Sequence, residues 1–379
     1  MTEPPLRLAV LGAGFAALRA ARELRRRAPA ATVTLVAPRA EFVYLPSLMW
    51  IPVGLRRGSE LVLPLDRFLA RQRIGFHAAT VTGLADGGRT VLTSAGNLAN
   101  DGLLVASGGR FLRGMPGIEH ALTLCEGVEA AERIGQRLAA MDGGHIAVGF
   151  GGNPKEPSAM RGGPMFELLF GIDCWLRRRG LRDRFTLTFF NAAAEPGKRL
   201  GDAAVKRLMT EMRRRGIGLR LGSPVKAFSP SAVTTEAGDI PADLILFMPG
   251  LTGPAWAEHS GLALSPGGLF QADDCCAAGA ARHVFIAGDC GSYPGPDWMP
   301  KQAHMADLQA RAAAVNLLDS LAGKAPQKRP RTELICVVDS LDGGMLVYRD
   351  IRRNVVLPNM KPMHWAKRAF EWYYLRSLR

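Results

Sequence analysis

A glycine turn between a short apolar strand and a helix, close to the N-terminus, constrains this chain more than any other feature. The strand is expected at residues 8–11, the Ala-rich helix runs to about residue 27, and a second strand follows in ATVTLVAP. Gly12, Gly14 and Ala17 form the arrangement G-x-G-x-x-A. The first glycine permits a tight turn, the second lets the backbone approach a pyrophosphate, and the small third residue lets helix pack on strand. This βαβ unit predicts a dinucleotide site at the helix N-terminus, with an ordinary tight turn as the alternative.

The end of the second strand departs from the usual dinucleotide pattern. The acidic residue that would bind the adenosine ribose is missing, and the chain has Ala37 and Arg39 in that region. The ribose must therefore be held in another way. Arg39 could approach a phosphate, and a solvated loop arginine is the alternative.

Two later segments also contain a strand that ends in small residues. DGLLVASGGR enters a turn at Ser107 and Gly108, and RHVFIAGDCGSY ends its strand at Gly288 and Asp289. Here the chain resembles the flavoproteins with two dinucleotide-binding domains, in which the first segment returns the chain to the FAD domain and the Asp of a G-D pair binds the ribityl chain. A carboxylate at the C-terminal end of a strand can accept a bond from a ribityl hydroxyl. A helix N-cap is the alternative role for Asp289.

Within that superfamily, the pyridine nucleotide-disulfide oxidoreductases, the chain resembles the sulfide:quinone oxidoreductases over essentially its whole length. Four stretches carry the resemblance, at residues 41–54, 162–173, 299–310 and 333–375. The resemblance implies an α/β fold with two Rossmann-like domains and a C-terminal amphipathic helical tail. It also implies an enzyme that binds FAD and passes electrons from a sulfide-type donor to a quinone. Two rival functions are an oxidoreductase of the same fold with another donor, NADH included, and a flavin-bound protein without turnover.

The resemblance also implies a division of the chain and a set of cofactor contacts. The expected parts are an FAD-binding part at 1–115, a second dinucleotide-like domain at 116–243, the rest of the FAD domain at 244–330, and a quinone and membrane region at 331–379. The cofactor-binding residues are Gly12, Gly14, Phe15, Ala17, Ala37, Arg39, Pro46, Ser47, Ser107, Gly108, Gly288, Asp289, Lys301, Gln302 and His304. Lys301 suits its place because a cation near the pyrimidine carbonyl stabilises an anionic reduced flavin.

A second strand runs into glycines in HIAVGFGGN, but the fingerprint breaks after it. Asn153, Pro154 and further bulky residues intervene before the helix expected at Pro164. No helix N-terminus follows promptly to receive a pyrophosphate, so an NADH site of the usual kind is not expected.

The cysteines limit how far the sulfide mechanism can be carried over. By the resemblance, Cys336 corresponds to the C-terminal redox cysteine and Cys125 to a more peripheral third cysteine. Arg161 stands where the partner of Cys336 is expected, and Cys174 lies too deep in the following helix to replace it. A catalytic Cys336 should have its thiolate favoured by positive surroundings, and a buried strand cysteine is the alternative.

The remaining cysteines have plain structural explanations. Cys174 is expected in the core, Cys275 and Cys276 in a surface loop, and Cys290 as a small packing residue. No spacing of His and Cys suggests zinc or another metal site.

The C-terminal tail has the pattern of an amphipathic helix. Its apolar residues recur at helical spacing: Trp365, Ala366, Ala369, Phe370, Tyr373 and Tyr374. Aromatic residues on one side and Lys/Arg on the other suit a membrane interface, where quinone is available, and packing against the body or a second subunit is the alternative. The resemblance places Leu346, Phe370 and Tyr373 at the quinone.

Charge and composition set the remaining expectations. The chain has 48 Lys and Arg against 34 Asp and Glu, a net charge of +14, which favours a polyanionic partner such as an anionic membrane surface. Nucleic acid is not expected, because no aromatic residues are interleaved with the Arg runs. Six cysteines and no evident leader favour the cytoplasm, and the strand-sized apolar runs favour peripheral attachment on the inner face of the membrane. A homo-oligomer is left open.

Overall fold

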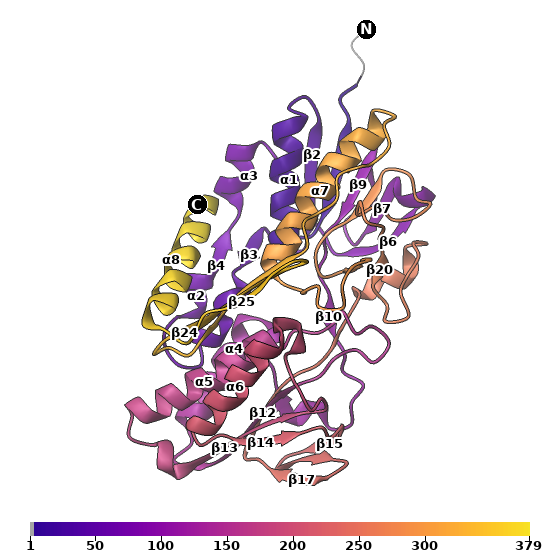
Figure 1. Cartoon of the computed structure of the whole chain (residues 1–379). Coiled ribbons are helices and arrows are strands. Elements are labelled where there is room, and N and C mark those ends of the chain that lie inside the picture. The colour runs from indigo at the N-terminus through magenta and orange to yellow at the C-terminus, as the bar shows by residue number, and fades with distance from the viewer. Residues whose placement is uncertain (1–3) are drawn as a thin grey trace.

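The computed structural model describes residues 4–379, apart from the side chain of Cys125, and contains two five-stranded parallel sheets. In Figure 1 one sheet lies in the upper half of the molecule and the other in the lower half. The helices are α1 (Phe15–Arg27), α2 (Gly58–Leu61), α3 (Asp66–Gln72), α4 (Val128–Ala139), α5 (Gly163–Arg178), α6 (Asp202–Arg214), α7 (Ala303–Leu321) and α8 (Lys361–Leu378).

The first sheet is built around the expected βαβ unit. Its order is β21 (Val284–Ile286), β9 (Gly102–Val105), β1 (Arg7–Leu11), β2 (Thr32–Ala37) and β5 (Gly75–Ala78). Helices α1 and α7 pack together on one face. The small antiparallel sheet of β6 (Val81–Ala85), β7 (Thr90–Thr93) and β8 (Leu98–Ala99) lies against the other face, where it shares a core with β1 and β9. Because both faces are covered, the strands β1, β9 and β21 are apolar from Leu8, Gly102 and Val284 onward.

The second sheet repeats this arrangement. Its order is β11 (Ala121–Leu122), β18 (Leu244–Met248), β12 (Gly144–Phe150), β13 (Phe185–Asn191) and β14 (Gly218–Leu221). One face packs against α4, α5 and α6, and the other against β15 (Val225–Ser229), β16 (Ala232–Thr235) and β17 (Gly238–Pro241). The helical sides of both sheets belong to one continuous apolar core.

The chain crosses between the two sheets later than the sequence suggested. The expected boundary at residue 244 falls at the start of β18, yet β18 pairs with β12 inside the second sheet. The chain leaves that sheet after Met248 and pairs β19 (Leu251–Thr252) with β10 (Arg110–Phe111) at the crossing. An apolar strand does not reveal which of two similar sheets it joins, so this boundary required the tertiary structure.

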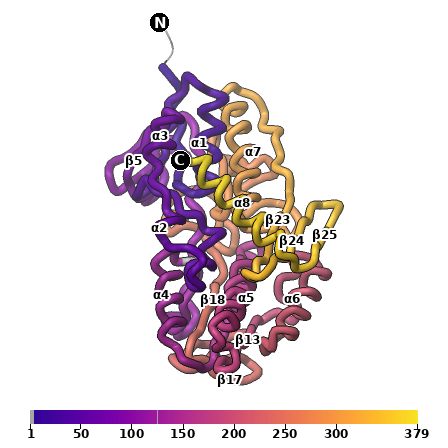
Figure 2. The backbone as a smooth tube through the Cα atoms, turned by 90° about the vertical axis from the view of Figure 1, so that its left-hand side faces the viewer, coloured from indigo at the N-terminus to yellow at the C-terminus, as the bar shows by residue number. Residues whose placement is uncertain are grey.

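The C-terminal region forms a hairpin sheet and a long helix along the joint between the two halves, as Figure 2 shows. The sheet consists of β23 (Glu333–Asp339), β24 (Gly344–Asp350) and β25 (Asn354–Val356). Helix α8 follows, and its end is held by Arg22 of α1 and Arg71 of α3, which both donate to the carbonyl of Ser377, at 3.3 and 2.9 Å. Among the helices of residues 4–379, none combines the length and apolarity that crossing a bilayer requires.

Short elements complete the chain. They are β3 (Glu41–Val43) with β4 (Val62–Pro64), β20 (Phe270–Gln271) with β22 (Gly291–Ser292), and the 3-10 helices η1 (Leu45–Trp50), η2 (Asp86–Gly88), η3 (Ile118–His120), η4 (Leu124–Glu126), η5 (Arg182–Arg184), η6 (Lys198–Leu200) and η7 (Ala255–His259).

Candidate functional site

The N-terminus of α1 has the shape that an FAD pyrophosphate needs. Gly12 has a φ of +116°, and a Cβ there would lie 2.4 Å from the carbonyl oxygen of Ala106, so only glycine fits the turn. A Cβ on Gly14, the N-cap of α1, would meet nothing within 4 Å, so backbone faces open space. The hydroxyl of Ser107 is buried without a hydrogen-bond partner among the described residues. An open helix N-terminus and an unpaired buried hydroxyl fit a bound dinucleotide.

The other expected contacts in this half lie at the ends of the same strands. Phe15 and Ala17 are buried in the first turn of α1, and Ala37 is buried at the end of β2. Arg39 lies beyond β2 with an exposed side chain, 3.6 Å from the carboxylate of Glu41. Gly108, with a φ of +69°, also faces open space.

Asp289 follows β21 at the C-terminal edge of the first sheet, where a ribityl chain would run. Gly288 precedes it with a φ of +81°, and the Gly288 amide donates to the side chain of Gln309 on α7 at 3.1 Å. The guanidinium of Arg161 forms an ion pair with Asp289, and its Nε donates to the carbonyl of Lys301 at 3.3 Å. The residue that replaces the expected cysteine therefore lies directly beside the carboxylate that is expected to bind the cofactor.

The first residues of α7 converge on the same place. The ammonium of Lys301 is buried, donates to the carbonyl of Gly291, and has its pKa lowered by burial. Gln302 is the N-cap of α7, and its amide donates to the carbonyl of Ile335 at 2.9 Å. His304 pairs with Glu333 at 2.8 Å. These two bonds tie the start of α7 to β23, the strand that carries Cys336.

Cys336 lies on β23 against the first turn of α5. A Cβ on Gly163 would be 4.0 Å from its sulfur, which places Cys336 close to the segment that contains Arg161. Burial, with a smaller contribution from the nearby carboxylate of Glu167, raises the pKa of the Cys336 thiol to about 12. The expectation that positive surroundings favour the Cys336 thiolate is therefore wrong. Burial and the acidic neighbour raise the thiol pKa by more than the Lys367 ammonium lowers it.

The other cysteines follow the structural expectations with one exception. Cys174 and Cys290 are buried, as expected, whereas Cys276 is also fully buried, under α7, and does not lie in a surface loop. Cys125 falls in η4, and its side chain is outside the described part of the chain.

A buried polar cluster beside Cys336 escaped the sequence analysis. Glu167 on α5 binds the ammonium of Lys367 and the backbone amide of Asp339, the latter at 3.3 Å. Asp339 also accepts bonds from Trp50 at 2.7 Å and pairs with His364 at 2.8 Å. Burial raises the pKa of Glu167 to about 7, with Lys367 opposing the shift. A carboxyl that titrates near neutrality can hold and release a proton.

A second buried contact joins η1 to α8. Ser47, fully buried after Pro46, donates to Glu371, and Arg56 pairs with the same carboxylate at 2.7 Å. The inner face of α8 is therefore partly polar, with His364, Lys367 and Glu371 one turn apart. This spacing was the signal that could have revealed both contacts.

The aromatic residues of α8 mostly face outward. Trp365, Phe370 and Trp372 are 62%, 59% and 61% exposed, and Tyr373 is 66% exposed. Tyr374 instead packs against Phe15, Phe42 and Tyr44 beside the start of α1. Of the quinone residues implied by resemblance, Leu346 is half-buried on β24, while Phe370 and Tyr373 are exposed on α8.

The segment after β12 folds against the chain that follows β18 before the next helix begins. Asn153 donates to the carbonyls of Leu251 and Gly267, at 2.9 and 3.0 Å, and the amide of Leu251 donates to Ala159 at 2.9 Å. Helix α5 begins only at Gly163. The late start of α5 agrees with the broken fingerprint, and the hydrogen bonds hold the segment against the chain that follows β18.

Comparison with known proteins agrees with this geometry. The family model described as pyridine nucleotide-disulphide oxidoreductase matches residues 6–310. A sulfide-quinone reductase of Aquifex aeolicus is 25% identical, over 98% of this chain and 90% of the relative. A type II NADH:quinone oxidoreductase of Staphylococcus epidermidis is 24% identical, over 93% and 92% of the two chains.

Among solved structures, the sulfide:quinone oxidoreductase of Aquifex aeolicus superposes with a TM-score of 0.90, at 23% identity, over 99% of this chain and 91% of the other. That likeness concerns the fold, and the family match covers both sheets. The chain therefore belongs to the pyridine nucleotide-disulphide oxidoreductase family.

Proposed function

We propose that this protein is an FAD-dependent oxidoreductase that passes two electrons from a sulfide-type donor to a quinone. The observation that carries the proposal is the convergence of three parts: an open dinucleotide cradle at Gly14, the carboxylate of Asp289, and a thiol on the strand that binds the first turn of α7. FAD, held by these residues, supplies the two-electron carrier. The relatives named for sulfide and for quinone support the same assignment.

The overall reaction defines what the chain's own residues must do. Hydrosulfide, quinone and one proton become zero-valent sulfur and quinol, so a proton must reach the quinone from the protein or solvent. Glu167 suits this task, because it is buried and its pKa is raised to about 7. Arg161 is paired with Asp289, and the guanidinium N–H groups that this pair does not use would bind an anionic donor.

Replacing Glu167 by Gln is expected to slow quinone reduction roughly 100-fold, because the side chain can no longer give up a proton. The charged and titratable groups around it are Lys367, Asp339, Cys336 and Tyr44. In the parent protein the rate should fall as pH rises through about 7, because the protonated form of Glu167 is then lost.

The measurement is the reoxidation of chemically reduced enzyme by a water-soluble quinone, followed from pH 6 to 9 in rapid mixing. Dithionite reduction in the absence of a sulfur donor keeps Cys336 chemistry out of the experiment. An unchanged rate and pH profile in Glu167→Gln would exclude Glu167 as the proton source.

NADH is expected to be a poor reductant, because the segment from Asn153 to Ala159 occupies the approach to the second glycine turn. A pyrophosphate needs free backbone amides at a helix N-terminus, and α5 begins too far from Gly151 to provide them. Rapid mixing with NADH tests this directly. Fast flavin bleaching at micromolar NADH would instead favour a type II NADH:quinone oxidoreductase, the function named for several relatives.

A different donor is the second candidate function, and Arg161 is the residue that favours it. With arginine at the partner position, no disulfide to Cys336 can form there, and the pKa of Cys336 is raised well above neutrality. Sulfur would then have to leave through an external acceptor such as sulfite or a thiol. The test is to measure the rate of quinone reduction with sulfide, with small thiols and with NADH, using the same quinone as acceptor each time. The donor that gives the fastest rate identifies the function.

The proposed site of action is the surface of a membrane, where quinone is dissolved. The exposed aromatic face of α8, made of Trp365, Phe370, Trp372 and Tyr373, suits an interface, and the net charge of +14 suits an anionic one. We propose peripheral attachment to that membrane, on its cytoplasmic side.

A further inference from the structure

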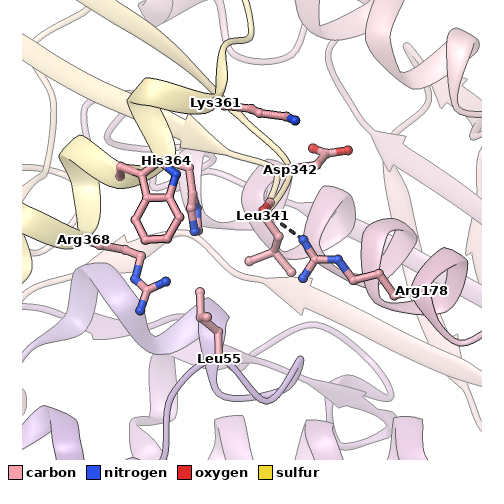
Figure 3. A pocket seen from close by; sticks show the side chains of 8 residues that line it. Leu55, Arg178, Leu341, Asp342, Lys361, His364 and Arg368 are labelled. Carbon is pink, nitrogen blue, oxygen red and sulfur yellow. Dashed lines mark hydrogen bonds between the residues drawn. The ribbon is translucent and has the colours of Figure 1, made fainter.

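A cavity of about 430 Å³ lies beside the first two turns of α8. Figure 3 shows side chains around it from the end of α5, the turn between β23 and β24, the first turns of α8, and the stretch after η1 that carries Leu55. Its lining residues are Leu55, Arg178, Leu341, Asp342, Lys361, His364, Trp365 and Arg368. This size is in the range of about 300–1,000 Å³ that small-ligand pockets have.

The charges around this cavity are unbalanced in favour of cations. Arg178, Lys361 and Arg368 all line it, and within residues 4–379 none of the three forms an ion pair with a carboxylate. Arg178 donates one bond, to the carbonyl of Leu341 at 3.1 Å, and a guanidinium has five N–H donors.

The acidic residues nearby already have cationic partners. Asp342, the one carboxylate in the lining, is bound by Arg215 at 3.0 Å and by the hydroxyl of Ser340 at 2.6 Å. His364 is engaged with Asp339 below the cavity. The cavity therefore offers a net positive lining to an anion.

The α8 helix itself adds to this positive field. It begins at Lys361, has no acidic residue in its first turn, and has no side-chain cap. Lys361, the first residue of α8, lines the cavity, so the positive end of the helix dipole lies beside the cavity, with no acidic residue in the first turn to neutralise it. Two separate sources, the side chains and the helix end, favour a negatively charged group here.

The cavity is also continuous with the exposed aromatic face of α8. Trp365 lines the cavity and is 62% exposed, and the Arg368 guanidinium lies 5.0 Å from the centre of its ring. Leu55 and Leu341 add apolar side chains to the lining. A ligand with an anionic head and an apolar remainder would thus place its head among the cations and its chains along Trp365.

We infer that this cavity binds the phosphate of an anionic phospholipid, with the acyl chains extending over Trp365 into the bilayer. The inference rests on the proposed membrane attachment and deepens it, because it assigns one lipid headgroup site within a broader interfacial surface. Bound lipid would fix the orientation of α8, and through His364 and Lys367 it would hold the buried cluster of Asp339 and Glu167 in place.

Binding of short-chain, monomeric phosphatidylglycerol to the holoprotein tests the inference, measured by titration calorimetry. One saturable site is expected. Phosphatidylcholine of the same chain length and inorganic phosphate should each bind at least about tenfold more weakly, because the first lacks net charge and the second lacks the apolar contact. Equal binding of inorganic phosphate would show a free-anion site and overturn the lipid assignment.

The double variant Lys361→Gln/Arg368→Gln should weaken phosphatidylglycerol binding by at least about tenfold. The matched control is Lys226→Gln/Arg352→Gln, which removes the same two charges from exposed positions on β15 and the turn after β24. Flavin content and far-UV circular dichroism check that both variants fold. An equal loss in the control would assign the effect to overall charge and overturn the pocket.

Vesicle flotation separates this inference from the membrane proposal on which it rests. If vesicles with phosphatidylglycerol bind the protein but the short-chain lipid does not saturate a site, the headgroup pocket is wrong and membrane attachment stands. If neither the vesicles nor the short-chain lipid binds, membrane attachment is wrong as well.

Discussion

Replacing Gly14 by valine is expected to yield a folded protein that purifies without flavin. A Cβ at this position meets no protein atom within 4 Å, so the substitution costs the chain itself little. The same side chain would occupy the space through which the pyrophosphate approaches the N-terminus of α1. Flavin absorbance of the purified protein, and flavin released on denaturation, should both fall to background, and quinone reduction with every donor should be lost.

Two other glycines provide controls for this prediction. Gly114→Val also adds a side chain where no atom lies within 4 Å, but away from the cradle, and should keep its flavin. Gly12→Val should fail to fold, because its Cβ would lie 2.4 Å from a backbone oxygen and φ is +116°. A yellow Gly14→Val protein with full flavin content would contradict the assignment of this cradle to FAD.

Replacing Cys336 by serine is expected to abolish flavin reduction by sulfide while leaving FAD bound. Cys336 lies on the strand tied to the start of α7, and its sulfur faces the first turn of α5. Serine preserves the size of the side chain but not the sulfur chemistry. The measurement is the rate of flavin bleaching by sulfide without quinone. Because burial raises the thiol pKa to about 12, this rate should rise toward alkaline pH in the parent protein if the thiolate is the reacting form.

Cys275→Ser is the matched control for this substitution, since Cys275 is a half-buried cysteine in a loop near residue 326. It should bleach as fast as the parent. Bleaching of Cys336→Ser at the parent rate would remove the sulfide mechanism. The complementary variant Arg161→Cys places a second sulfur near Cys336, and a gain of sulfide:quinone activity there would show that arginine at this position changed the donor.

Much of the cradle could be predicted from local sequence. Gly12 is required by a tight turn and Gly14 faces an open approach, both within a few residues of each other, and the central strand β1 is a short apolar run after Arg7. The break after Gly151 was equally legible, because prolines exclude an immediate helix. Such features depend on residues that are close together in the sequence, so they can be predicted from the sequence alone.

Three features depend instead on what packs against them in the folded chain, and no local pattern contains that information. They are the protonation of Cys336, the burial of Cys276 and the sheet that β18 joins. The tail illustrates the same limit most clearly. Helical spacing identified α8, yet the pattern suggested that its aromatics and its basic residues would divide the surface between them.

In the structure, Lys367 instead turns inward to Glu167, and Glu371 turns inward to Ser47, while the aromatics remain outside. A charged side chain is buried only where an opposite charge or a hydrogen bond compensates the loss of water. Here Lys367 and Glu167 are 200 residues apart along the chain, and Glu371 and Ser47 are 324 residues apart. The sequence alone therefore determined the local elements and the cofactor cradle, and the tertiary structure decided which polar groups meet inside, because that pairing exists only once distant elements pack together.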